Sequence, residues 1–307
     1  MAILSTLGPL LLALLLGYWW NTRLLTAARI DLGLKWLTNI ILALIGYSIG
    51  SLENLQDKLV TAGTSAAVLL ALILALNIGA LFLSGHYLNP NQADENSDTS
   101  PTQAKLSWGI FADSIQTVGW VLIGGLAGFY LNDLLVGVDT LVTGLLYLLL
   151  FLIGRQLYLG NYRLRKLFLN TQGLIIAATT ILSTWLAGII GAYLLDMPMN
   201  EGLAVVSGFG WYSLSGILLT GLGSPVLGTT AFLLDISREV LALMLIPLLS
   251  RLSSHTTVGF SGATAMDFTL PMLGKFHGSI IIPTAIASGF VMSIAVPVLI
   301  PLFQSLS

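Results

Sequence analysis

Two short sequences decide the fold of this chain: SGFGWYSLSG at residues 207–216 and SGATAMDFTLP at residues 261–271. Both are rich in glycine and small polar residues, although the sequence around them is apolar. Between them lies DISRE at residues 235–239, in which three residues are ionisable. Non-helical backbone is tolerated inside a membrane only where it is buried in protein or lines a cavity. These two broken segments therefore predict the interior of a membrane protein.

The ionisable residues of this region are Asp235, Arg238, Glu239 and Asp267. Charged side chains at membrane depth are costly, and they usually mark a binding site or a transport pathway. Because the charges and the broken segments coincide, we place the candidate functional site here.

The composition of the chain is that of a membrane protein. Of its 307 residues, 56% are hydrophobic and 8% are charged, whereas soluble domains contain roughly 25% charged residues. Cysteine is absent, which excludes disulfides and thiol nucleophiles. The 12 basic residues form no basic aromatic patch, so nothing indicates nucleic-acid binding. We expect no metal and no cofactor.

Eight apolar runs are long enough to cross a bilayer, for which about 20 residues are needed. Two further segments, 202–222 and 257–273, are dense in Gly, Ser, Thr and Pro, and we interpret them as broken or re-entrant; if both cross, the spans number ten. We predict one all-α transmembrane domain of secondary-transporter type over residues 1–307. The runs are 3–20, 34–52, 59–85, 106–131, 139–159, 173–195, 226–250 and 281–303.

The basic residues predict the orientation, because they collect on the cytoplasmic side of a membrane. One cluster is Arg23 with Arg29, and the other is Arg163 with Arg165 and Lys166. Both clusters fall on the same side when the spans alternate. We therefore expect both termini to lie outside the cytoplasm.

Two other segments have simple interpretations. The first apolar run lacks a preceding basic region, so we expect a transmembrane helix rather than a cleaved signal peptide. The polar segment 89–104 has the composition of a flexible cytoplasmic linker.

Charge counting gives the acidic residues a role. Asp235 and Glu239 are four residues apart and share one face of a helix, while Arg238 is near enough to pair with either. Asp267 has no cation nearby in sequence. One interpretation is an ion network that only holds helices together. The surplus of negative charge favours another, in which the site takes a cationic ligand or protons.

The first broken segment also contains groups suited to an anion. Gly208 and Gly210 permit unusual backbone conformations, and Ser213 and Ser215 carry hydroxyls. A helix that begins there offers free N–H groups and the positive end of its dipole, which suit a substrate carboxylate. In the second segment Thr269 follows Asp267, and we include it among the candidate binding residues. Discontinuous helices of this kind are typical of secondary transporters.

At these residues the chain resembles a known family. The strings GFGWYSLSGILLT at 208–220, DISRE at 235–239 followed by LMLIP at 243–247, and MDFTLP at 266–271 are similar to those of the bacterial L-lysine exporter family of LysO type. The resemblance covers essentially the whole chain. It implies an inner-membrane exporter of L-lysine and of its toxic analogue thialysine, with both termini outside. It also implies an essential pair of solvent-accessible acids at Glu239 and Asp267.

These residues suggest a mechanism of alternating access. Two carboxylates take the ammonium groups of lysine or exchange them for protons, while backbone N–H groups take its carboxylate. The alternative is a cation/proton antiporter that uses the same acids. An enzyme is disfavoured, because neither a second aspartate-rich motif nor Gly-x-Gly-Asp occurs. The sequence leaves open whether protons or sodium ions are coupled, and whether the chain forms a homo-oligomer in the lipid.

Overall fold

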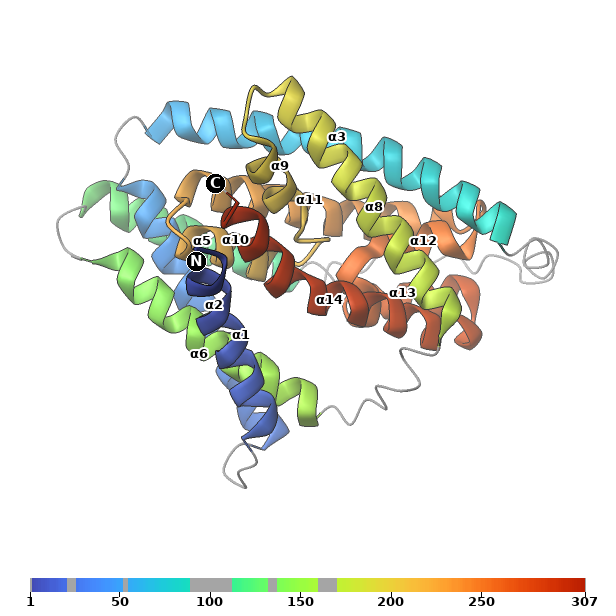
Figure 1. Cartoon of the computed structure of the whole chain (residues 1–307), viewed down its shortest axis with the longest axis horizontal. Coiled ribbons are helices and arrows are strands. Elements are labelled where there is room, and N and C mark those ends of the chain that lie inside the picture. The colour runs from blue at the N-terminus through green and yellow to red at the C-terminus, as the bar shows by residue number, and fades with distance from the viewer. Residues whose placement is uncertain are drawn as a thin grey trace.

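A computed structural model of the chain describes residues 2–20, 26–51, 55–88, 112–131, 137–159 and 170–306. Over these ranges the protein is all-helical, with no strand (Figure 1). The predicted linker 89–104 and the basic residues Arg23, Arg163, Arg165 and Lys166 lie outside the described residues.

Each of the eight predicted spans forms a helix. The largest difference is at the second, which begins at Ala27 rather than near residue 34. Four of the helices, α2, α3, α8 and α14, are long and apolar enough to cross a membrane by length and composition. The eight helices are α1 (Ala2–Trp19), α2 (Ala27–Gly50), α3 (Leu55–Leu88), α5 (Ala112–Tyr130), α6 (Val138–Leu159), α8 (Thr171–Leu194), α11 (Pro225–Leu249) and α14 (Ile282–Gln304).

The two remaining segments are broken, as predicted. The first consists of α9 (Met199–Val206) and α10 (Tyr212–Gly221), separated by a tight turn. The second consists of α12 (Ser254–Ser261), the 3₁₀ helix η2 (Gly262–Met266) and α13 (Leu270–His277), and a short 3₁₀ helix η3 (Ser279–Ile281) leads from it into α14. In both segments the break coincides with glycines at positive φ, Gly210 in the first and Gly262 in the second.

Packing shows that the first broken segment begins and ends at the same end of the helix bundle. Helices α8 and α14 are parallel, because a Cβ on Gly173 would touch Ala287 while the Trp185 ring lies 5.5 Å from that of Phe303. Gln304 at the end of α14 donates a 3.1 Å hydrogen bond to Ser224 at the start of α11. The end of α8 and the start of α11 therefore lie at the same end of the bundle, which we call the terminal end.

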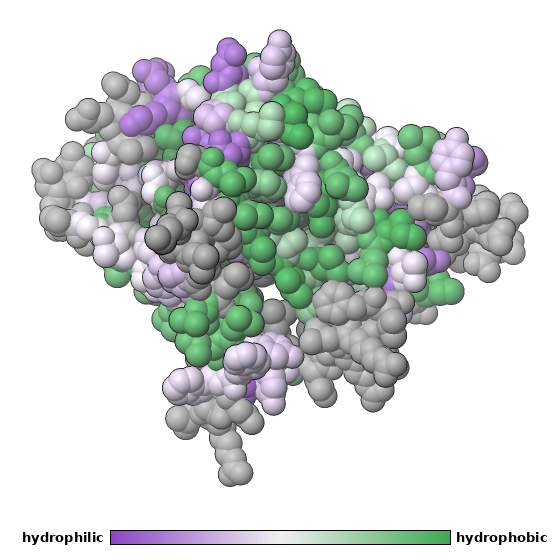
Figure 2. All heavy atoms as spheres, in the orientation of Figure 1, coloured by the Kyte–Doolittle hydropathy of each residue, from purple (hydrophilic) through white to green (hydrophobic). Residues whose placement is uncertain are grey.

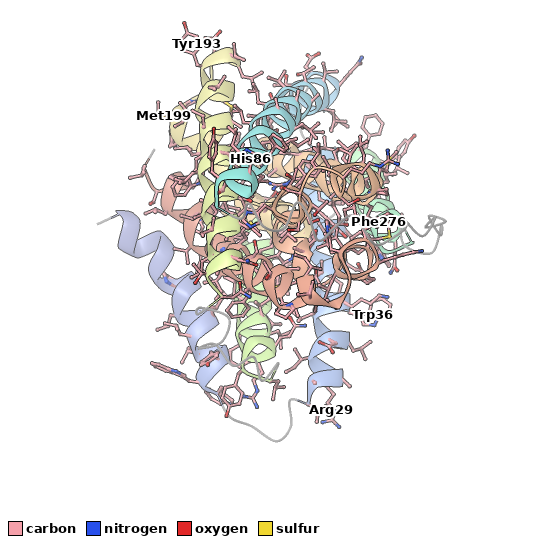
Figure 3. All side chains as sticks on the ribbon, turned by 90° about the vertical axis from the view of Figure 1, so that its right-hand side faces the viewer. Arg29, Trp36, His86, Tyr193, Met199 and Phe276 are labelled. Atoms are coloured by element: carbon pink, nitrogen blue, oxygen red, sulfur yellow. The ribbon has the colours of Figure 1, made fainter. Side chains whose placement is uncertain are left out.

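The second broken segment turns back in the same way at the opposite end. Ser253, after α11, packs against Gly85 near the end of α3, and Asn170 before α8 donates a 3.4 Å hydrogen bond to Thr284 in α14. Helix α3 is antiparallel to α8, since Asn77 bonds Thr184 and Leu69 packs on Gly191. We call this the basic end; its described basic residues include Arg29, Arg251 and Lys275. Figure 3 shows Arg29 opposite Tyr193 and Met199.

Close glycine contacts join the amino-terminal helices. Gly124 and Gly128 of α5 lie directly against the backbone of Ala43 and Tyr47 in α2, and Gly154 of α6 lies against Leu14 in α1. Such contacts let transmembrane helices approach closely. On the outside, hydrophobic residues cover the middle of the molecule (Figure 2), as expected for a surface in contact with lipid.

Candidate substrate site

The tips of the two broken segments meet inside the bundle. The amide of Ala263 donates a 2.9 Å hydrogen bond to the carbonyl of Phe209. Gly262 has a φ of +68°, and a Cβ at this position would lie 2.1 Å from the Phe209 oxygen. A glycine is therefore required where the second tip crosses the first.

Asp235 is buried, and its carboxylate accepts hydrogen bonds from two groups of the first broken segment. Its Oδ1 accepts from the Gly210 amide at 2.7 Å, and its Oδ2 accepts from the Ser215 hydroxyl at 2.6 Å. A Cβ on Gly208 would lie 1.8 Å from Oδ2, so only glycine allows this approach. In this conformation the donors of Gly210 and Ser215, which we expected to face a substrate carboxylate, are therefore occupied by Asp235.

Arg238 connects α11 to the backbone of α12, and it is also attracted electrostatically to the Asp235 carboxylate on its own helix. Its Nε donates to the Phe260 carbonyl at 3.3 Å, its Nη2 donates to the Gly259 carbonyl at 3.4 Å, and its guanidinium lies 5.9 Å from the centre of the Phe260 ring.

Two other candidates are also buried. Glu239 is 4% exposed, lies one turn from Asp235 on α11, and lines neither of the hollows described below. Thr269 is fully buried, and its hydroxyl donates a 3.0 Å hydrogen bond to the Thr264 carbonyl.

Asp267 is the exposed acid of this region. It follows η2 directly, and its carboxylate accepts from the amide of Phe268. Asp267 and Trp211 line both of two neighbouring hollows between the amino-terminal helices and the broken segments. Asp267 is therefore exposed at both hollows.

The first hollow contains a second carboxylate, and we call it the acidic hollow. Its volume is about 340 Å³. Asp31 of α2 lines it together with Asp267, and Gln156 of α6 donates a 3.0 Å hydrogen bond to Asp31 Oδ1. It extends to Ala27 and Leu159 at the basic end. Its other residues are Ile30, Ile153, Trp211, Ala263, Thr264, Met266 and Ser293.

The second hollow, which we call the polar hollow, lies at the start of α10. Its volume is about 360 Å³, and it contains Lys35 of α2 and Ser213 in the first turn of α10. Of the predicted candidates, Ser213 and Asp267 are thus the ones that face a hollow. Its other residues are Leu34, Thr38, Asn39, Gln116, Leu149, Ile153, Gln156, Trp211, Tyr212 and Leu214.

Our reading of the sequence missed Asp31 and Gln156. Both are polar residues close to apolar runs, and that signal was present. Asp31 fell in a connection because the second span was expected to begin near residue 34, whereas α2 already begins at Ala27.

This arrangement defines a class of protein. Discontinuous helices that meet inside an all-helical bundle, beside hollows lined by ionisable residues, are typical of membrane transport proteins. The comparisons with known proteins identify the family: the chain belongs to the LysO lysine exporters. The family described as "Lysine exporter LysO" matches residues 118–304.

Two relatives agree with this assignment. The chain is 38% identical over 302 residues to "Lysine exporter LysO" of Escherichia coli K12, with 98% of this chain and 99% of that protein covered. It is 40% identical over 185 residues to a Haemophilus influenzae protein named "Putative lysine exporter", covering 60% of this chain and 95% of that protein. No solved structure matches the chain significantly. The protein is thus a multi-pass inner-membrane transporter for amino-acid export, and not an enzyme.

Proposed function

We propose that this protein exports L-lysine and its analogue thialysine from the cytoplasm, in exchange for protons, by alternating access. The observation that carries the proposal is the position of Asp267. It is an exposed carboxylate that lines both hollows, next to the point where the two broken segments meet. The names of the two relatives support lysine as the substrate.

The proposed topology has eight spans and two re-entrant segments. Each broken segment begins and ends at one end of the bundle, which favours this count over ten. The basic end faces the cytoplasm by the rule that basic residues collect there, so both termini are periplasmic. The acidic hollow includes Ala27 and Leu159 at the basic end, which supports access to the site from the cytoplasm in this proposal.

Charge decides how lysine lies in the site. Asp267 takes an ammonium group, since it is exposed and acidic. The substrate carboxylate lies in the polar hollow, where Lys35 and the first turn of α10 near Ser213 supply positive charge and the positive end of a helix dipole. This arrangement assigns the carboxylate to the start of α10, because Asp235 already occupies the donors of Gly210 and Ser215.

The two acids of the predicted pair have different roles in this proposal. Asp267 meets the substrate, whereas Glu239, which is buried here, carries the proton in the return step. Asp235 and Arg238 maintain the broken segments in the geometry that the site needs.

Uptake and efflux of labelled lysine in proteoliposomes test the proposal. We expect lysine counterflow in the wild type, acceleration by an opposing proton gradient, and loss of both in Asp267→Asn. Lysine transport that does not respond to the proton gradient but responds to a sodium gradient would show that sodium, rather than the proton, is the coupling ion. Cation/proton exchange without lysine transport would instead support the antiporter alternative.

A further inference from the structure

We infer that Asp31 is a second cation-binding residue of the substrate site, and that it recognises the side-chain ammonium group of the substrate. This inference rests on the proposed function. It assigns to the acidic hollow the selection of amino acids that carry a second positive charge over amino acids of the same shape that lack it.

The first observation is that two carboxylates from distant parts of the chain line the acidic hollow. Asp31 comes from α2 in the amino-terminal helices, and Asp267 comes from the second broken segment. The other residues that line this hollow are mostly apolar or small, such as Ile30, Ile153 and Ala263. An aliphatic chain with a cation at its far end matches this lining, because the methylene groups contact apolar walls while the ammonium group reaches a carboxylate.

The second observation is that Asp31 is held in position from another helix. Gln156 of α6 donates a 3.0 Å hydrogen bond to Oδ1 of Asp31 and also lines both hollows. One carboxylate oxygen is therefore used to orient the side chain. The hydrogen bond from a neutral amide does not neutralise the negative charge of Asp31, so the carboxylate can still attract a cation.

The third observation is the separation of charge between the hollows. Lys35 lies one turn after Asp31 on α2, but it lines the polar hollow, whereas Asp31 lines the acidic one. Asp267 belongs to both. A ligand with a carboxylate and an α-ammonium group at one end, and a second ammonium group at the other, complements this arrangement in one orientation. The side chain then extends from Asp267 toward Asp31.

The experiment compares binding of L-lysine and L-norleucine to the purified protein in lipid nanodiscs. Norleucine has the same carbon chain as lysine but lacks the side-chain amine. The test variant is Asp31→Asn, which keeps an oxygen for the Gln156 amide and removes only the charge. We expect lysine affinity to fall about tenfold, the factor that about 1.4 kcal/mol represents, and norleucine affinity to stay the same.

Two further variants separate recognition from a structural role. Gln156→Leu removes the hydrogen bond between α2 and α6 but keeps the carboxylate, so lysine should retain most of its advantage over norleucine. Asp57→Asn removes an exposed carboxylate of α3 at the terminal end and should change neither affinity. Equal weakening of both ligands by Asp31→Asn, or no effect on lysine, would overturn the inference.

The outcomes also separate this inference from the proposed function. If Asp267→Asn abolishes lysine binding while Asp31→Asn leaves the preference for lysine intact, only the role of Asp31 is wrong. If the wild type shows no preference for lysine over norleucine, both proposals fail.

Discussion

The backbone amide of Ala263 donates a 2.9 Å hydrogen bond to the backbone carbonyl of Phe209, and this contact joins the tips of the two broken segments. Because both groups belong to the backbone, substitution of either side chain leaves the hydrogen bond in place. The contact is instead sensitive to Gly262, whose missing Cβ makes the approach possible. A motion of one tip is thereby linked to the other.

Replacement of Gly262 should stop transport. In Gly262→Ala the new methyl group would lie 2.1 Å from the Phe209 oxygen, so the two tips must separate. We expect loss of lysine export at normal membrane levels, measured by efflux and immunoblotting. Gly278→Ala is the matched control, because Gly278 also has positive φ, at +75°, but its Cβ would meet no atom within 4 Å. If both variants lost export equally, the cause would be backbone strain at a positive φ, and not the contact between Gly262 and Phe209.

The effect of a substitution of Asp235 on stability should depend on whether the new side chain keeps the hydrogen bonds of Asp235. Asp235→Asn retains an oxygen for the Gly210 amide and places an NH₂ beside the Ser215 hydroxyl, which can accept. Asp235→Leu leaves the Gly210 amide buried without a partner, at about 1–3 kcal/mol, and leaves the Ser215 hydroxyl with only the Tyr212 carbonyl at 3.4 Å. Thermal unfolding in detergent should therefore show a clearly lower Tm for the leucine variant. A leucine variant as stable as the asparagine variant would contradict this role.

The acids Glu239 and Asp267 should each be essential for export. Glu239→Gln and Asp267→Asn keep the shape of the side chain and remove its charge and its titration, so neither a proton nor an ammonium group is bound as before. Cells that carry these variants should export no lysine and be sensitive to thialysine, with normal protein levels in the membrane. Asp235→Asn should be milder, and Asp57→Asn should resemble the wild type. Wild-type export by both amide variants would make the acids structural.

Cysteine labelling should establish the topology, because the chain has no native cysteine. Exposed positions on described helices or at their ends suit this measurement. Tyr193→Cys should react with impermeant reagents from the periplasm, whereas Arg251→Cys and Lys275→Cys should react from the cytoplasm. Periplasmic labelling of Arg251→Cys would show that the first broken segment crosses the membrane.

Local composition was sufficient to predict the helices and their breaks. A run of apolar residues must hide its backbone polar groups in lipid, and a helix does so without help from distant residues. The glycine-rich strings at 207–216 and 261–271 interrupt such runs, so both breaks were predicted correctly. The family resemblance implied solvent-accessible acids at both Glu239 and Asp267; Asp267 is exposed, whereas Glu239 is buried between helices.

The tertiary structure decided which partners the ionisable residues bind. Arg238 bonds carbonyls of α12 and Asp235 bonds the first broken segment, in addition to the attraction between Arg238 and Asp235 that sequence spacing had suggested. The spacing of residues along one helix predicts which side chains share a face of that helix. It does not predict which backbone groups of distant segments will need a hydrogen-bond partner. Asp31 and Asp267 line one hollow because the fold brings α2 and the second broken segment to the same cavity, and such an arrangement of distant parts of the chain leaves no trace in local sequence.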